Sequence, residues 1–330
     1  MRHRVLFHLT VMLLILSWPL VCSAQVDTPQ VWPTIDLTRK PISTPPPEKP
    51  EPRFRVEIQG EVAWQKRLLD SPFPISESVE RAVLSTGDVS TRTEQTTVSH
   101  LDEQVRLELV LIKLFYRLTE RIEVNGKIGT GRLVTKIDNL RGQFLVEEFI
   151  DSLPLFSLAF PFSDPNSHEG SGSQGFAAGA GVNVILLQSA APNLALILGS
   201  QWTYLQSDDI LNIRRDVEIE ESRTHLVDVG LTARHQRGRF SGEAGVGITW
   251  LLTEYEGHFT KRIFDFGSAE GFSLKTEKTP FSFSTGPKAF PVVGRLGFEY
   301  SVTDSIGLKV QGTAGNSQTY SVTGGFYYRF

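Results

Sequence analysis

The chain from Phe54 to Phe330 repeats one pattern, in which apolar residues occupy every second position over segments of about ten residues. Phe54, Val56 and Ile58 begin it, and Tyr328 and Phe330 end it. A period of two is typical of β-strands with one apolar face. A tilted strand of about ten residues is also long enough to cross a lipid bilayer.

The arrangement of these segments narrows the fold further. They lie at 54–64, 104–116, 121–131, 175–187, 194–206, 223–235, 239–252, 291–300, 306–314 and 318–330. Long connections at 65–103, 132–174, 207–222 and 253–290 alternate with short ones at 117–120, 188–193, 236–238 and 301–305; the last, 315–317, is also short. Long loops at one rim and tight turns at the other are typical of transmembrane barrels. The sequence predicts an all-β, antiparallel, up-and-down transmembrane β-barrel of about ten strands, within a range of roughly eight to twelve.

Helical membrane proteins fit the sequence less well. The mean hydropathy is −0.12, too low for a bundle of apolar helices. The uncharged stretch from Gly170 to Ser207 is the one candidate for a helical hairpin. Its glycines disfavour helices, and Ala190 to Asn193 resembles a turn, so two strands are favoured.

The first 53 residues differ from the rest. Arg2 and Arg4, an apolar run and small residues up to Ala24 predict a secretory signal peptide cleaved after Ala24. The lone cysteine, Cys22, would leave with it. Residues 25–53 are rich in proline, with eight of the chain's 18 prolines between 29 and 52, and predict an extended periplasmic leader that serves as a spacer, a tether or a docking segment. Three parts follow: signal peptide 1–24, leader 25–53 and barrel 54–330.

The final strand carries a resemblance to a known class. Phe326, Tyr328 and Phe330, at alternate positions up to the C-terminus, resemble the terminal signature of Gram-negative outer-membrane β-barrels. The resemblance reaches the architecture of small barrels, such as the OmpX-like and opacity-protein groups, and no specific family. It implies export to the cell outer membrane, recognition by the barrel-assembly machinery, and contact with outer-membrane lipid and lipopolysaccharide. Tyr116 and Tyr300, next to short turns, are expected in an aromatic girdle.

Polar residues alternating with the apolar ones are expected to line the lumen. In 104–116 we place Val105, Leu107, Leu109 and Leu111 toward lipid, which leaves Arg106 and Glu108 inside. The predicted lumen network contains seven cationic and seven anionic residues: Arg55, Glu57, Glu61, Arg106, Glu108, Glu123, Lys127, Asp228, Arg234, Glu243, Arg295, Glu299, Lys309 and Arg329. Such a balance favours ion pairs that plug a narrow barrel, with a porin-like channel for small solutes as the alternative.

The long loops carry the remaining candidate for function. Residues 140–162 are too apolar for a solvated loop and could act as a gate, line a lipid-facing groove or bind a partner. We favour an extension of the third and fourth predicted strands beyond the bilayer, with this segment packed as a short helix over the barrel mouth. The function expected is structural or surface-interaction through the extracellular loops.

Catalysis is the alternative from another class. Ten-stranded barrels include the omptin surface proteases, whose sites use acidic residues and a histidine at the extracellular rim. His100, His168, His225 and His258 fall in or near the predicted loops, with Asp102, Asp164, Asp208 and Asp209 as possible partners. No local motif matches, so we expect no enzyme.

Other kinds of site have weaker support. We expect no catalytic, cofactor or metal site, although a Ca²⁺ site at Asp208 and Asp209 stays open. A formal net charge of −4 disfavours nucleic acid as a partner.

Overall fold

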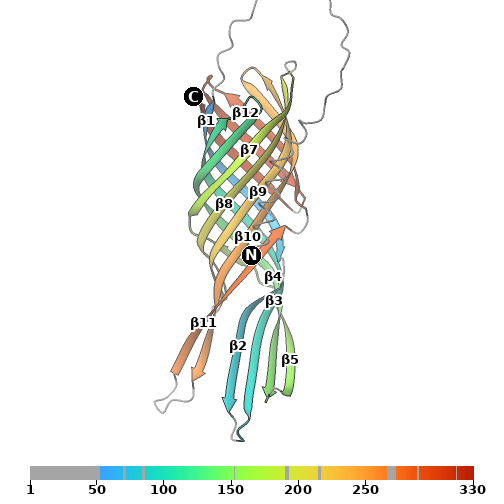
Figure 1. The fold of residues 1–330 in the computed structure, drawn as a ribbon, viewed down its shortest axis with the longest axis vertical. Helices are drawn as coiled ribbons and strands as arrows, with labels where there is room; N and C mark the ends of the chain where they lie inside the picture. Colours follow the sequence, from blue (N-terminus) through green and yellow to red (C-terminus); the bar gives the residue numbers. More distant parts are fainter. Residues whose placement is uncertain are drawn as a thin grey trace, which may run out of the picture. The chain divides into compact units, whose positions relative to one another are not determined.

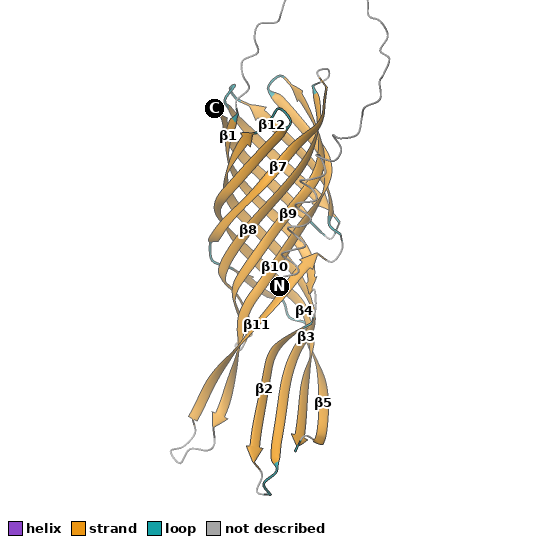
Figure 2. Cartoon of the chain, in the orientation of Figure 1, coloured by secondary structure: helices purple, strands orange, loops and turns teal. Residues whose placement is uncertain are grey.

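The computed structural model describes residues 53–69, 72–83, 86–151, 153–189, 193–214, 217–265, 273–287, 290–316 and 318–330. This part of the chain is built of strands and turns, with no helix in it (Figure 2). It accordingly offers no long apolar helix that could cross a membrane. The predicted signal peptide, its cleavage at Ala24 and nearly all of the proline-rich leader lie outside the described residues.

Each of the ten predicted strands is present, and several run longer than expected. They are β1 (Phe54–Leu69), β3 (Val89–Arg117), β4 (Ile122–Ile150), β7 (Gly175–Ser189), β8 (Leu194–Arg214), β9 (Val217–Arg237), β10 (Phe240–Asp265), β12 (Val292–Ser301), β13 (Ile306–Gly315) and β14 (Tyr320–Arg329). Four further strands are β2 (Phe73–Val83), β5 (Leu153–Asp164), β6 (His168–Ser171) and β11 (Ser273–Pro287). The uncharged stretch forms β7 and β8, so a helical hairpin is wrong there.

The ten strands close into a ring of antiparallel neighbours (Figure 1). The ring runs β1, β3, β4, β7, β8, β9, β10, β12, β13 and β14, and β14 returns to β1 with Arg55 opposite Arg329 and Trp64 opposite Tyr320. The predicted up-and-down β-barrel is confirmed. The whole sheet has 14 strands, more than the predicted ten, because β2, β5, β6 and β11 join it outside the ring.

The barrel has two different ends. The short turns at 118–121, 238–239 and 302–305 lie at one, together with residues 54 and 330; we call this the turn end. At the other, the extension end, β3 and β4 reach 29 residues each, well beyond what a bilayer needs. Residues 89–103 escaped prediction because polar side chains on both faces of a strand give no apolar alternation.

The barrel wall narrows toward the extension end. There β11 pairs with both β1 and β10. It takes the place that β12 to β14 occupy nearer the turn end. Similarly, β6 pairs with β4, and the next segment bonds to β8 through Ser173 N and Asp208 O, 2.8 Å apart. Eight strands therefore line this part, namely β1, β3, β4, β6, β8, β9, β10 and β11. An eight-stranded barrel is just wide enough for side chains to fill.

The apolar segment 140–162 differs from its prediction. It holds the end of β4 and most of β5, paired from Leu140 opposite Asp164 to Ile150 opposite Leu153, so the predicted short helix is wrong. A hairpin satisfies its backbone hydrogen bonds within the sheet. Leu155, Leu158 and Phe160 of β5 stay exposed.

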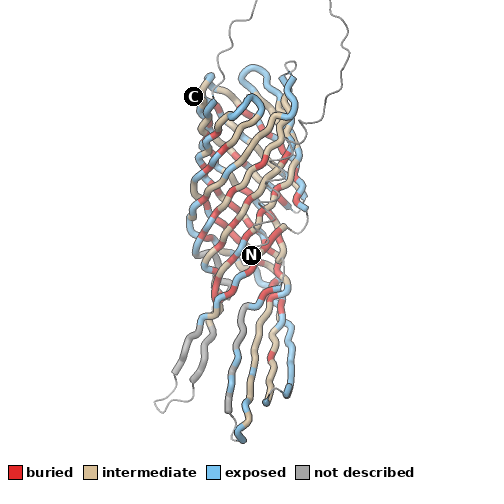
Figure 3. Tube along the Cα trace, in the orientation of Figure 1, coloured by how far each residue is buried: buried red, intermediate tan, exposed pale blue. Residues whose placement is uncertain are grey.

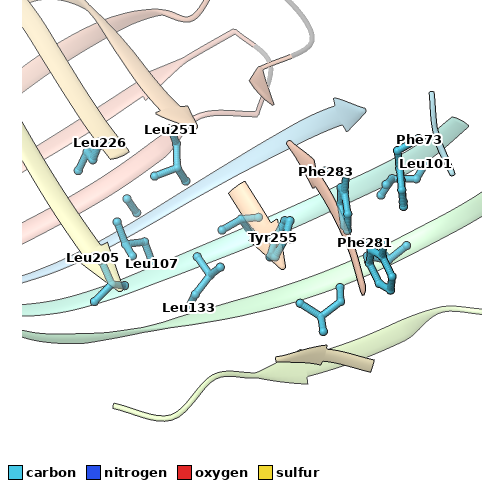
Figure 4. Packing of buried hydrophobic residues seen from close by; sticks show 14 of the residues in the cluster. Phe73, Leu101, Leu107, Leu133, Leu205, Leu226, Leu251, Tyr255, Phe281 and Phe283 are labelled. Carbon is cyan, nitrogen blue, oxygen red and sulfur yellow. The ribbon is translucent and has the colours of Figure 1, made fainter. Parts of the chain in front are cut away.

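A hydrophobic cluster crosses the lumen where the ten-stranded part of the wall meets the narrowed part. Figure 3 shows buried and exposed positions alternating along the wall, and Figure 4 shows the cluster. It takes residues from seven ring strands: Ala63, Leu107, Leu109, Leu111, Leu133, Ala177, Leu205, Leu226 and Leu251. Gly131 of β4 makes room for Leu109, because a Cβ there would lie 2.5 Å from Leu109 Cδ2.

Candidate functional site

An apolar belt covers the outer face of the ring. Large apolar side chains on it are exposed where a soluble protein would bury them: Val110, Ile112, Leu114, Ile128, Phe176, Leu231, Val246, Val292, Leu296, Phe298, Leu308, Val310, Val322 and Phe326. Eleven residues of β1, from Phe54 to Trp64, cross it. At about 3.3 Å per residue and a tilt of about 40° they span roughly 25 Å, the height of the lipid-facing band of outer-membrane barrels.

Aromatic pairs border the belt on both sides. At the turn end, the ring centroids of Phe54 and Tyr116 lie 4.8 Å apart, as do those of Phe240 and Tyr300. Tyr328 contacts Phe330 there, also at 4.8 Å. Toward the extension end, Trp64 lies opposite Tyr320 in the sheet, and Trp250 contacts Phe290 at 5.1 Å. Aromatic rings at two levels are typical of side chains at the two interfaces of a membrane.

Twelve of the fourteen predicted lumen residues face the barrel interior. They are Arg55, Glu57, Glu61, Glu123, Lys127, Asp228, Arg234, Glu243, Arg295, Glu299, Lys309 and Arg329. Many of them meet: Arg55 and Glu123 are 3.5 Å apart, Arg234 and Glu243 3.1 Å, and Lys309 and Glu243 3.7 Å. Arg295 pairs with Asp228, and Arg329 pairs with Glu299. These groups occupy the wider, ten-stranded part of the lumen.

Arg106 and Glu108 are the exceptions, and their predicted position is wrong. Both lie on the outer face of β3, while Leu107, Leu109 and Val105 point inward and are buried. The odd-numbered residues of β3 point inward throughout 105–115, since Val110, Ile112 and Leu114 lie on the same outer face as Arg106 and Glu108. The leucines at 107, 109 and 111 fill the lumen, and assigning them to lipid reversed the predicted phase of the whole strand.

A buried polar network lies between the apolar cluster and the extension end, and it was not predicted. The side chains of Arg67 and Glu103 are fully buried, and Arg67 Nη2 lies 3.0 Å from Glu103 Oε2. Tyr255 donates a hydrogen bond to Glu103, and Thr135 Oγ1 donates another at 2.8 Å. Arg67 also donates to Thr253 Oγ1 at 2.6 Å. Arg67 continues the inward phase of β1, but the predicted strand stopped at Trp64.

Lys113 is a second lumen residue that sequence reasoning missed. It lies on β3 opposite Glu57 of β1, with its side chain on the inner face. The reversed phase assigned to 104–116 placed it outside. The correct phase of this one strand would have identified Lys113, whereas Glu103 lies just before the predicted strand.

The solved structures similar to this chain include two bacterial proteins of low sequence identity. The translocator domain of the autotransporter NalP from Neisseria meningitidis is 12% identical, with 84% of this chain and 89% of that chain covered and a TM-score of 0.33. The outer membrane protease OmpT from Escherichia coli is 11% identical, with 84% and 97% covered and a TM-score of 0.35. The chain matches no family model and no curated protein.

The closed antiparallel ring and the exposed apolar belt on its outer face make this chain an integral membrane β-barrel. Similarity this distant transfers no role from any of those proteins, so the function of this barrel has to be argued from its own residues. The three residues of the predicted assembly signal, Phe326, Tyr328 and Phe330, are all exposed, with Phe326 and Tyr328 on the outer face of β14.

The four histidines considered for a protease site each contact different residues. His168 Nε2 lies 3.2 Å from Asp164 Oδ2, and His100 Nε2 lies 4.0 Å from Asp102 Oδ1. Hydrogen bonds from the backbone and side chain of Asn166 and from His168 lower the pKa of Asp164, the backbone bond most strongly. His225 accepts a hydrogen bond from Trp202 Nε1 at 3.3 Å on the outer face.

The remaining residues considered for a protease site do not come together either. His258 contacts Glu218 and Glu220, not an aspartate. Asp208 is exposed on β8, and the side chain of Asp209 lies outside the described part of the structure. The described residues therefore assemble no aspartate and histidine constellation of the omptin kind.

Proposed function

We propose that this outer-membrane barrel is closed to solutes and acts at the cell surface through its extension end. The observation that carries the proposal is the apolar cluster across the lumen, to which seven strands of the wall contribute. An apolar constriction without water blocks ions even when the lumen beside it is polar. The charged groups at the turn end would then line a blind vestibule, not a pore.

The extension end supplies the surface that such a role needs. Its strands β2 to β5 continue the sheet past the belt, and β5 pairs only with β4, which leaves one of its edges unpaired within the described sheet. Leu153, Leu155, Phe156, Leu158 and Phe160 of β5 are all exposed. An edge strand with exposed apolar side chains favours contact with another molecule. A structural or surface-interaction role fits this arrangement better than transport.

Conductance tests the proposal. Refolded protein in planar bilayers is expected to give no reproducible single-channel current, because no water column crosses the apolar cluster. Removing the cluster's volume with Leu107→Ser and Leu133→Ser, two residues paired across β3 and β4, is expected to produce measurable current. Stable current from the unmodified protein would instead establish the channel alternative.

We further propose that Arg106 and Arg132 bind phosphate groups of lipopolysaccharide. Glu108 Oε1 lies 2.9 Å from Arg106 Nε, and its Oε2 lies 2.6 Å from Arg132 Nε. The side chains of Arg106 and Arg132 are 42% and 50% exposed on the outer face, a few residues along their strands from the level of the belt residue Val110. Paired guanidinium groups at this level match the phosphates of the outer leaflet.

Binding of purified lipopolysaccharide checks this assignment. The double variant Arg106→Gln and Arg132→Gln is expected to bind it roughly thirtyfold more weakly in detergent, since each of the two lost charge-assisted contacts contributes on the order of 1 kcal/mol. Arg92→Gln is the matched control, because Arg92 is equally exposed but lies far along β3. Equal affinity of the parent and the double variant would rule the contact out.

A further inference from the structure

One histidine beyond the belt is buried between two glutamate side chains, an arrangement that the barrel does not need for its stability. His258 of β10 has a side chain that is only 7% exposed, although it points to the outer face. Its Nδ1 lies 3.0 Å from Glu220 Oε1, and its Nε2 lies 3.1 Å from Glu218 Oε2. Nε2 is buried and makes no hydrogen bond, although Glu218 lies close to it.

We propose that His258 and Glu218 bind a divalent transition-metal ion, with zinc as the best match, and that Glu220 positions the imidazole. Glu220 holds Nδ1 as a donor, so the lone pair of Nε2 is available to a metal. A carboxylate on the far nitrogen of a metal-binding histidine is the usual outer partner of such a ligand. The three ligand atoms offered by His258, Glu218 and Glu220 lie within 4.8 Å of one another.

The distance between the two inner ligand atoms fits one shared ion. With metal–ligand bonds of about 2.0–2.1 Å, atoms 3.1 Å apart subtend an angle of about 100° at the metal. This angle lies between octahedral and tetrahedral values. An imidazole ligand favours zinc and its neighbours over calcium or magnesium, which prefer oxygen ligands only.

The local backbone builds this arrangement. A bulge between Glu256 and Gly257 shifts the register of β10 against β9, so that Gly257 faces Ile219 and His258 faces Glu218. The bulge leaves Glu220 as the extra residue of β9, and its carboxylate reaches the same histidine. Gly257 permits the close approach, because a Cβ there would lie 2.2 Å from the Glu218 carbonyl oxygen. Bulges often re-aim side chains in this way at functional sites.

Charge and access also suit a cation. The side chains of Glu218 and Glu220 are 47% and 57% exposed, so solvent can reach the site and water can complete the coordination. The nearby cation Arg223 is held by Glu221 and Glu256, at 2.9 and 3.0 Å. Lys278 of β11, opposite Thr260, is the other described cation on the adjoining strands near the site.

Calorimetry with zinc chloride tests the proposal on the full chain, refolded in detergent and free of any histidine tag. We expect one zinc ion per chain with a Kd in the micromolar range, as about three ligands or fewer from the protein would give. His258→Ala and Glu218→Gln are each expected to weaken binding at least tenfold. Glu220→Gln is expected to weaken it by about 10–100-fold while retaining the same stoichiometry. Cobalt in place of zinc should give a visible absorption band that His258→Ala abolishes.

His235→Ala provides the control, since His235 is an exposed histidine of the neighbouring strand β9. It is expected to bind zinc as the parent does. Undiminished zinc binding by both His258→Ala and Glu218→Gln, or no binding by the parent at millimolar zinc, would overturn the proposal. The Glu218→Gln variant keeps the test decisive if His258→Ala does not fold, because the Glu218 side chain is half exposed and isosteric with its replacement.

Discussion

Replacing Glu103 by glutamine is expected to lower the free energy of unfolding by about 3–5 kcal/mol. Arg67 is fully buried, and Glu103 Oε2 lies 3.0 Å from its Nη2. Removing the carboxylate charge leaves a guanidinium in the barrel interior without its counter-charge. Burial raises the pKa of Tyr255 well above its ordinary value, so its hydroxyl stays protonated and serves the carboxylate as a donor. The substitution therefore weakens several contacts of one network.

Urea unfolding in lipid vesicles, followed by tryptophan fluorescence, measures the loss. Glu94→Gln is the matched control, because the Arg92–Glu94 pair is just as short, at 2.8 Å, but Arg92 is 48% exposed. Exposed pairs of this kind contribute about 1 kcal/mol or less. The double variant Arg67→Met and Glu103→Leu should recover much of the stability, since it removes both charges together. A loss from Glu103→Gln no larger than that of the control would contradict the buried ion pair.

The alternation of apolar residues was enough to predict the ring. Each segment that crosses the belt has lipid on one side, so its outer positions are apolar and the period of two survives in the sequence. The unpredicted parts lie where that constraint ends. Residues 89–103 of β3 face solvent on the outside and carry polar side chains on both faces. Their sequence therefore predicted a loop. The missing strand length hid Arg67 and Glu103, and the reversed phase of β3 hid Lys113.

The sequence also failed to show which side chains of β3 face the lumen, for a related reason. Leu107, Leu109 and Leu111 alternate as regularly as Val110 and Ile112, so both faces of the strand look apolar. Only the neighbouring strand decides between them. Gly131 of β4, next to Leu109 in the sheet, leaves the inner side open to a large residue. Pairing of this kind is a property of the fold, and a single strand does not reveal it.

The two residues of the proposed zinc site are likewise brought together by the pairing of strands. Glu218 and His258 are far apart in the sequence and belong to no recognisable motif. The register of β9 and β10, including one bulge, brings them to 3.1 Å. A one-residue slip in that register would move His258 away from Glu218.

The inward orientation of Leu109 leads to a second prediction of large effect. Leu109→Ala is expected to cost about 2–5 kcal/mol of stability, because it removes a packed side chain and leaves a cavity in the apolar cluster. The adjacent Val110→Ala is expected to cost about 1 kcal/mol, since Val110 is 55% exposed on the belt and lipid chains fill the space it vacates. Urea unfolding in vesicles compares the two.

A fluorescent label separates orientation from stability at the same two positions. The only cysteine of the sequence is Cys22, so Leu109→Cys or Val110→Cys on a chain that starts after residue 24 carries a single reactive thiol. A bimane attached at position 110 is expected to be quenched by lipids that carry a nitroxide on the acyl chain, because that side chain faces the bilayer. A bimane at position 109 is expected to be protected, because the barrel wall lies between it and the lipid. Quenching at 109 with protection at 110 would restore the phase that the leucine pattern alone suggested and would remove the basis for a closed lumen.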